Sequence, residues 1–116
     1  MAKFMLTFLG GNQNLRYSNL SGVEKDEREK HLAAWKAWMA GLAKAGKLET
    51  GYPLAADGKK VTADGIEDFH FPDTSPGGFV VLSADSLDEA AKLAQTSPIV
   101  RNKGDILVRP CPEIPA

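Results

Sequence analysis

The sequence contains two histidines, which are the side chains best suited to transfer a proton near neutral pH. His31 precedes Trp35, Trp38 and Leu42 at steps of four, three and four residues, the spacing of one face of a helix. A partly buried imidazole beside two indoles could act as a general acid or base. The alternative interpretation is a histidine at the rim of the core, with its nitrogens hydrogen-bonded to backbone groups.

His70 belongs to a second candidate group, in residues 67–73 (EDFHFPD). Alternation along a strand would place Asp68 and His70 on one face, and Phe69 and Phe71 on the other. Asp68 could orient His70, or both could bind a metal ion, which in most sites needs at least three protein ligands. The sequence has no His-x-x-x-His or Cys-x-x-Cys spacing, so we expect no metal and no cofactor. The alternative is a solvated loop with both phenylalanines tucked inward.

Several further side chains are candidates for contacts with a small ligand, namely Trp35, Trp38, Tyr17, Arg16 and Arg101. The tryptophans could form the wall of a pocket for a planar molecule, although aromatic pairs at helical spacing are more often core residues. Tyr17 and Arg16 could close over such a pocket, or could equally be surface residues. Arg101 could bind an anionic group, although a solvated turn is the favoured interpretation. Cys111 has no nearby base in the sequence, so we expect an incidental thiol.

The bulk composition is that of an ordinary folded domain. The 116 residues fit one domain, and 43% hydrophobic with 25% charged residues argues against disorder. The 14 basic and 15 acidic side chains nearly balance, which gives no electrostatic reason to expect nucleic acid or an anionic membrane as a partner. We expect a single domain over residues 1–116, in which residues 110–116 form a proline-rich tail.

The sequence also bears on the cellular compartment. A single cysteine excludes an intramolecular disulfide, so nothing indicates an oxidising environment. No apolar run approaches the roughly 20 residues of a membrane helix, and the first apolar run is short for a signal peptide. We therefore expect a cytoplasmic protein.

Hydrophobic periodicity and turn residues predict the elements that position these side chains. Two helices begin at capping boxes, Ser21 with Glu24 and Ser86 with Glu89, and end before Gly46 and Pro98. On the first helix the apolar stripe is Leu32, Trp35, Met39 and Leu42, and on the second it is Leu87, Ala90, Ala91 and Ala94. The predicted strands are residues 4–9, 48–54, 59–63, 79–82 and 106–108, with a turn at residues 57–58 and a long loop over 64–78.

This order of elements predicts an α+β fold, with a ferredoxin-like antiparallel sheet and both helices on one face. The other face of the sheet would then be apolar and bare, and a soluble protein must cover such a face. A second copy of the chain offers a matching face through a two-fold axis. The sequence therefore predicts a homodimer.

Two parts of the chain resemble the YCII-related family. Residues 29–35 (EKHLAAW) and 46–54 (GKLETGYPL) resemble its first helix and second strand, while 77–82 (GGFVVL), 86–90 (SLDEA) and 97–100 (SPIV) resemble its later motifs. The family's Asp-Gly-Pro-Phe motif is reduced here to Asp64-Gly65, and Ser97 stands where several relatives have an acidic residue. The resemblance implies a dimeric α+β barrel, related to muconolactone isomerase, with a cleft between sheet and helix.

Two functions from different classes fit these observations. The first is a cofactor-independent enzyme that catalyses proton transfer, isomerisation or lysis of a small organic acid or lactone, with His31 as the acid or base. The second is a non-catalytic module that binds a small molecule or responds to one. A weaker third option is an interaction protein that pairs with another chain through the open sheet face.

Overall fold

The computed structural model describes residues 2–10, 22–55, 57–71, 75–98 and 104–114. Four strands form an antiparallel sheet, and they are β1 (Ala2–Gly10), β2 (Leu48–Pro53), β5 (Gly78–Ala84) and β6 (Gly104–Cys111). Their order in the sheet is β2-β5-β1-β6, and every neighbouring pair is antiparallel. Within these residues, no helix is long and apolar enough to cross a membrane.

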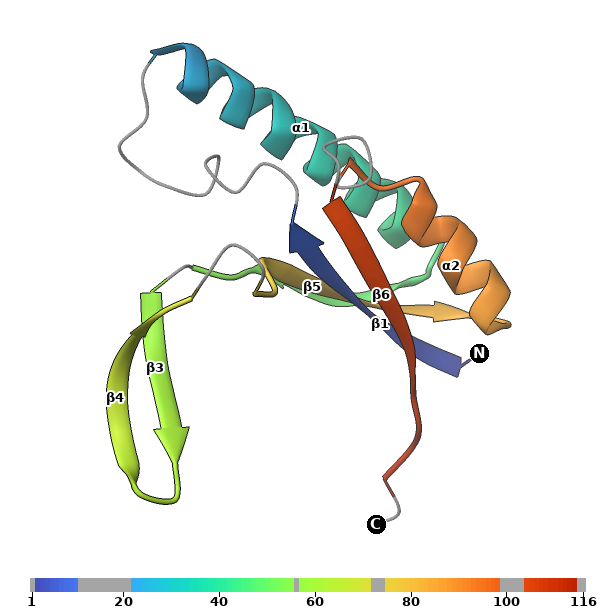
Figure 1. The fold of residues 1–116 in the computed structure, drawn as a ribbon. Coiled ribbons are helices and arrows are strands. Elements are labelled where there is room, and N and C mark those ends of the chain that lie inside the picture. The colour runs from blue at the N-terminus through green and yellow to red at the C-terminus, as the bar shows by residue number, and fades with distance from the viewer. Residues whose placement is uncertain (1, 11–21, 56, 72–74, 99–103, 115–116) are drawn as a thin grey trace.

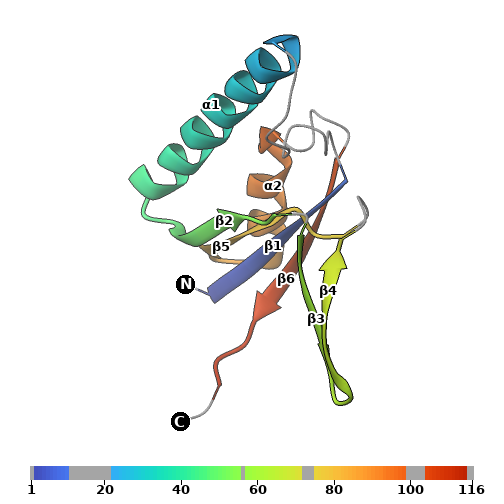
Figure 2. The ribbon, with the colours of Figure 1, turned by 90° about the vertical axis from the view of Figure 1, so that its left-hand side faces the viewer.

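Both helices, α1 (Gly22–Lys44) and α2 (Leu87–Gln95), lie on the same face of this sheet (Figures 1 and 2). The predicted α+β, ferredoxin-like fold class is therefore confirmed. The strand predicted over residues 79–82 is β5, and it lies between β2 and β1 as a central strand. The predicted last strand is longer than expected, because β6 continues through Pro110, which is opposite Phe4, to Cys111. Since β6 is at the sheet edge, a proline without an N–H is tolerated there.

A separate hairpin differs from the prediction. It consists of β3 (Asp57–Thr62) and β4 (Gly65–His70), which pair with each other as a two-stranded sheet. Residues 57–58 therefore lie in a strand rather than a turn, and the loop predicted over 64–78 contains β4. The strand predicted over residues 59–63 corresponds to β3, whereas β4 falls in the predicted loop because most of its side chains are exposed and turn-forming residues flank it. The hairpin projects away from the helices (Figures 1 and 2).

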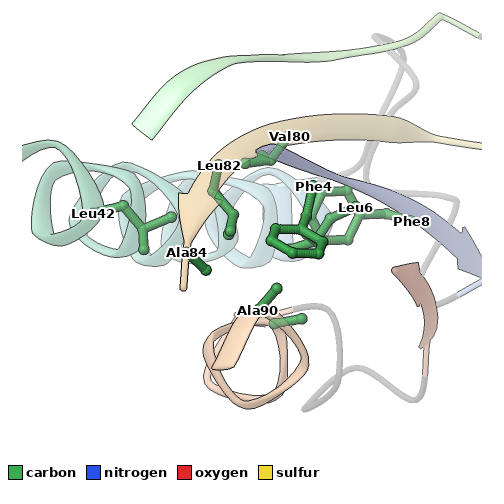
Figure 3. Packing of buried hydrophobic residues seen from close by; sticks show 9 residues of the cluster. Phe4, Leu6, Phe8, Leu42, Val80, Leu82, Ala84 and Ala90 are labelled. Carbon is green, nitrogen blue, oxygen red and sulfur yellow. The ribbon is translucent and has the colours of Figure 1, made fainter. Parts of the chain in front are cut away.

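The core lies between the sheet and the helices. Alternate residues of β1 and β5 point into it, and α1 and α2 supply the facing side chains (Figure 3). Its members are Phe4, Leu6, Phe8, Leu42, Val80, Leu82, Ala84, Ala90 and Ala94. Leu6 and Leu82 are completely buried. The inward-facing residues of β1 line the core along the length of the strand. Phe8 lies at the end of the sheet where α1 carries its tryptophans.

The C-terminus of α1 follows the sequence prediction closely. Gly46 has a φ of 73°, and the N–H of Lys47 donates to the carbonyl of Leu42 at 2.9 Å, as in a Schellman cap. Trp35, Trp38 and Met39 pack against the core, as the apolar stripe predicts. Leu32 does not, because it is 43% exposed and does not belong to the core cluster.

The buried face of α2 is also rotated from the predicted one. Ala90 and Ala94 are buried and Leu93 packs against the core, whereas Leu87 and Ala91 are exposed. The apolar character of Leu87 therefore did not indicate which face of α2 is buried, because the sheet contacts only the side of the helix that carries the two small alanines. Ser97 follows Ala90 and Ala94 on this buried side.

The predicted cap of α2 is present and carries an ion pair. Ser86 Oγ accepts a hydrogen bond from the N–H of Glu89 at 3.1 Å, and Glu89 Oε2 accepts one from the N–H of Asp85 at 3.2 Å. Lys47 Nζ donates to Glu89 Oε1 at 2.6 Å. Glu89 therefore joins the start of α2 to the turn that precedes β2.

We expect acid to destabilise the protein in part by protonating Glu89. The hydrogen bond from Lys47, with a further one from the Asp85 N–H, holds the pKa of the Glu89 carboxyl below its ordinary value. A lowered pKa stabilises the fold fully above the unfolded-state pKa, roughly 4.3, and this stabilisation is lost as the pH falls through the folded-state pKa. Urea unfolding at neutral pH and at about pH 3 should show a smaller acid-induced loss of stability for Glu89→Gln than for the wild type.

The control for this measurement is Glu113→Gln, because Glu113 is an exposed residue beyond the end of β6. Its acid-induced loss of stability should equal that of the wild type. Equal losses in all three proteins would show that Glu89 does not couple folding to pH.

Candidate functional site

Three aromatic rings meet where the end of β1 faces α1. Phe8 lies 4.7 Å from Trp35 and 6.3 Å from Trp38, measured between ring centroids, and the two indoles are 5.4 Å apart. All three contacts are edge-to-face, the geometry that the quadrupoles of the rings favour. Both tryptophans are half-buried, so each indole contributes to the core and also to the surface. We call these three residues the tryptophan wall.

The end of α2 holds one side of the tryptophan wall in place. Trp38 Nε1 donates a hydrogen bond to Thr96 Oγ1 at 2.9 Å, and this hydroxyl donates to the carbonyl of Leu93 at 2.6 Å. The chain of two hydrogen bonds fixes the ring of Trp38 against the C-terminal turn of α2. Thr96 carries no signal in the sequence, because its contact with Trp38 depends on how the two helices cross.

Ser97 is the unexpected member of this region. It is completely buried, and its Oγ has no hydrogen-bond partner among the described residues. Buried hydroxyl groups are almost always hydrogen-bonded, because an unpaired one keeps the cost of leaving water. Ser97 follows Ala90 and Ala94 at steps of four and three residues, which places a polar residue on the buried side of α2. This spacing is the signal in the sequence that could have identified Ser97.

His31 lies in α1 one turn before Trp35, so it is on the same side of the helix as the tryptophan wall. Its side chain is not among those described. Arg16, Tyr17 and Arg101 also lie outside the described residues. Gly10 and Gly104, the described residues next to the segments that carry them, pair with each other two residues beyond Phe8.

The second candidate group lies on the hairpin. Asp68 and His70 share a face of β4, as alternation predicts, but they do not pair with each other. His70 Nδ1 lies 2.6 Å from Asp57 Oδ1, and Lys59 Nζ donates to Asp68. The residue positioned to orient His70 is thus Asp57, which sequence analysis did not single out because it lies on the neighbouring strand.

The surroundings of these hairpin pairs are open. The side chains of His70 and Asp57 are 63% and 87% exposed, and the adjoining depression, of about 530 Å³, is shallow and faces solvent. Phe69 and Phe71 occupy the opposite face, where their rings pack edge to face with centroids 4.8 Å apart. No group of three or more His, Cys, Asp or Glu side chains within the described ranges could hold a metal ion. This exposure makes the hairpin a weaker candidate for catalysis than the tryptophan wall.

The face of the sheet opposite the helices carries exposed apolar side chains at its centre, and the same alternation places the charged Lys3 and Arg109 on it as well. Met5 is 37% exposed and Leu107 is 50% exposed, and the alternation of β1 and β6 places both on this face. Thr7, Val81, Phe79 and Tyr52 extend the same surface across the sheet, as the strand register shows. We call Met5, Leu107 and these four residues the open face.

Comparison with known proteins decides the family. The model of the YCII-related domain matches residues 12–113. The chain belongs to the YCII-related family. A search of curated proteins gives no match. A solved structure with the same fold is 5-chloro-2-hydroxyhydroquinone dehydrochlorinase from Burkholderia phenoliruptrix AC1100, in complex with 2,5-dihydroxybenzoquinone. The two chains share 17% identity with a TM-score of 0.57, over 92% of this chain and 90% of the other.

The family resemblance seen in the sequence is thus confirmed over most of the chain. In this YCII-related protein the matched range includes α1 with His31 and both tryptophans, and also the end of α2 with Ser97. The β3–β4 hairpin lies within the same range and follows the second strand of the four-stranded sheet. The solved neighbour shares the fold across nearly the whole chain, so the elements that carry the tryptophan wall belong to the common architecture.

Proposed function

We propose that this YCII-related protein is a cofactor-independent enzyme that transfers a proton on a small planar organic acid, of the hydroxyquinone or lactone type. The observation that carries the proposal is the tryptophan wall. Trp35 and Trp38 are half-buried indoles held at fixed angles, and His31 lies one turn away on the same helix. The family relationship supports the proposal, since the solved neighbour is a dehydrochlorinase with a hydroxyquinone bound.

The proposed chemistry assigns separate tasks to separate side chains. The indole edges and faces provide an apolar surface against which a planar ring is desolvated and oriented. His31 removes or delivers a proton at the bound ring, because an imidazole has its ordinary pKa close to neutrality. Arg16 and Arg101 bind the negative charge that an acidic ring oxygen carries. Tyr17 closes over the ligand from the segment that follows β1.

The test is a binding and exchange experiment. The chain has two tryptophans, both in the tryptophan wall, so a bound ring should change tryptophan fluorescence. We expect 2,5-dihydroxybenzoquinone to bind with one molecule per chain in calorimetry and to quench both indoles. In D₂O, ring protons of the bound ligand should exchange with solvent faster than without protein, as followed by proton NMR.

Control variants separate the site from nonspecific quenching. Trp35→Phe should lower affinity while keeping an aromatic ring at the wall, and Tyr52→Phe, an exposed aromatic change on the sheet, should leave affinity unchanged. Stoichiometric binding with no exchange and no product would favour the non-catalytic binding module. If no planar organic acid binds, the proposed function is wrong.

We further propose that the protein is a homodimer in which a second copy covers the open face, forming a dimeric α+β barrel. Its support is the exposure of Met5 and Leu107 on a face that no described element of the chain covers (Figure 1). A sheet with one apolar face in water needs such a cover, and a two-fold axis presents the same surface on both copies.

A further inference from the structure

The hydroxyl of Ser97 has no structural task among the described residues. It is completely buried, whereas the neighbouring hydroxyl of Thr96 accepts from Trp38 and donates to the Leu93 carbonyl. Two adjacent hydroxyls at the same helix end thus differ, since that of Thr96 makes two hydrogen bonds and that of Ser97 makes none with the described residues. An unpaired buried hydroxyl can be satisfied by a ligand or by a water molecule.

Ser97 lies next to the residue that holds the tryptophan wall in place. Ser97 follows Ala90 and Ala94 on the side of α2 that packs on the sheet, and both alanines are in the same core cluster as Phe8. The N–H of Ser97 donates to the carbonyl of Ala94 at 3.0 Å, which continues the helical path. Thr96, the preceding residue, touches Trp38. The backbone of Ser97 therefore lies at the end of α2 that contacts Trp38.

The chemistry of the surroundings limits what the hydroxyl can bind. A serine hydroxyl can donate one hydrogen bond and accept others, so it suits an oxygen that is a carbonyl, an enol or a phenol. The neighbouring core side chains are apolar, and a fully charged group would lose its hydration there without an ionic partner. A neutral or charge-delocalised ring oxygen fits this setting better than a carboxylate or a phosphate.

We propose that Ser97 determines specificity by hydrogen-bonding a hydroxyl or carbonyl oxygen on the ring of a planar ligand bound against the tryptophan wall. This inference rests on the proposed function and adds to it the feature of the ligand that is selected. Ser97 binds and orients the ring oxygen and transfers no proton itself. A site built around such a hydrogen bond rejects a ligand that lacks the oxygen, because the hydroxyl is then left unpaired.

The test compares phenol with toluene, two neutral rings of nearly the same size that differ in one hydroxyl. The quantity measured is the ratio of their dissociation constants, obtained by calorimetry and tryptophan fluorescence for each protein. We expect Ser97→Ala to reduce the preference for phenol about tenfold, the value of one hydrogen bond of ordinary strength. The variant should still bind toluene at least as well as the wild type.

The matched control is Ser83→Ala. Ser83 is also buried, at 6% exposure, but its hydroxyl already donates to Glu49 Oε1 at 2.7 Å on the sheet. Ser83→Ala should lower the melting temperature and leave the preference for phenol unchanged. In contrast, Ser97→Ala should keep or raise the melting temperature of the ligand-free protein, because it removes an unpaired buried hydroxyl and no hydrogen bond.

The outcomes distinguish this inference from the proposed function. If phenol and toluene both bind and Ser97→Ala keeps the wild-type preference, the role of Ser97 is wrong while the aromatic site stands. If Ser97→Ala lowers the melting temperature as Ser83→Ala does, with the preference intact, the hydroxyl serves the fold. If neither these rings nor 2,5-dihydroxybenzoquinone binds the wild type, both proposals are overturned.

Discussion

Replacing His31 by alanine is expected to lower the rate of ligand proton exchange by about a hundredfold or more, the usual contribution of a general acid or base. The loss should appear in the rate at saturating ligand and leave the dissociation constant within a few-fold, because the tryptophan wall still holds the ring. Added imidazole should restore part of the rate in His31→Ala. A residue with a merely structural role would not respond to imidazole, so this rescue distinguishes proton transfer from support of the fold.

The control for His31 is Lys36→Ala, which removes an exposed side chain from the same helix. It should exchange ligand protons at the wild-type rate. His31→Ala with an unchanged rate, or with a lost rate that imidazole does not restore and a melting temperature that falls, would contradict the assignment. His70→Ala supplies a further comparison, because His70 lies exposed on the hairpin beside Asp57 and should leave the rate unchanged.

The second large effect concerns the open face. Leu107→Glu is expected to raise the dissociation constant of the homodimer at least a hundredfold, because two symmetry-related carboxylates would be buried against an apolar partner surface. Such a change corresponds to about 3 kcal/mol in the free energy of association. Sedimentation velocity over a range of concentrations should show a dimer for the wild type and a monomer for the variant.

Leu87→Glu provides a matched control, since Leu87 is similarly exposed, at 46% against 50% for Leu107, but lies at the start of α2. This variant should remain dimeric. Circular dichroism should show that both variants keep the secondary structure of the wild type. A wild type that is monomeric at all concentrations, or a Leu107→Glu variant that dimerises as tightly, would exclude the open face as the interface.

The two candidate groups differ in how much of their geometry can be predicted from residue spacing alone. The helical spacing of Trp35 and Trp38 is enough to predict that they share a face, and their edge-to-face contact follows from it. The partner of His70 was beyond reach of the same reasoning, because Asp57 is thirteen residues away along the chain and meets it only across the β3–β4 pairing. Local periodicity describes one element at a time, whereas an ion pair between strands depends on their register.

The hairpin shows the limit of hydrophobic patterning. The strand predicted over residues 59–63 is found as β3, but β4 has almost no buried face by which it could be recognised as a strand. Gly and Asp residues near its ends then favour turns, and the whole of residues 64–78 resembles a loop. Backbone hydrogen bonds between β3 and β4 form regardless of that pattern, and only the three-dimensional structure reveals them.

By itself, the sequence determined the α+β class, the two helices and the family, because each depends on local periodicity, capping residues or short motifs. It also placed His31 and the two tryptophans on one helix face. Only the tertiary structure decided that Trp38 is anchored by Thr96, that Asp57 faces His70, and that Ser97 is buried without a described partner. These features arise where elements distant in the chain meet, and the angle and register of that meeting are properties of packing.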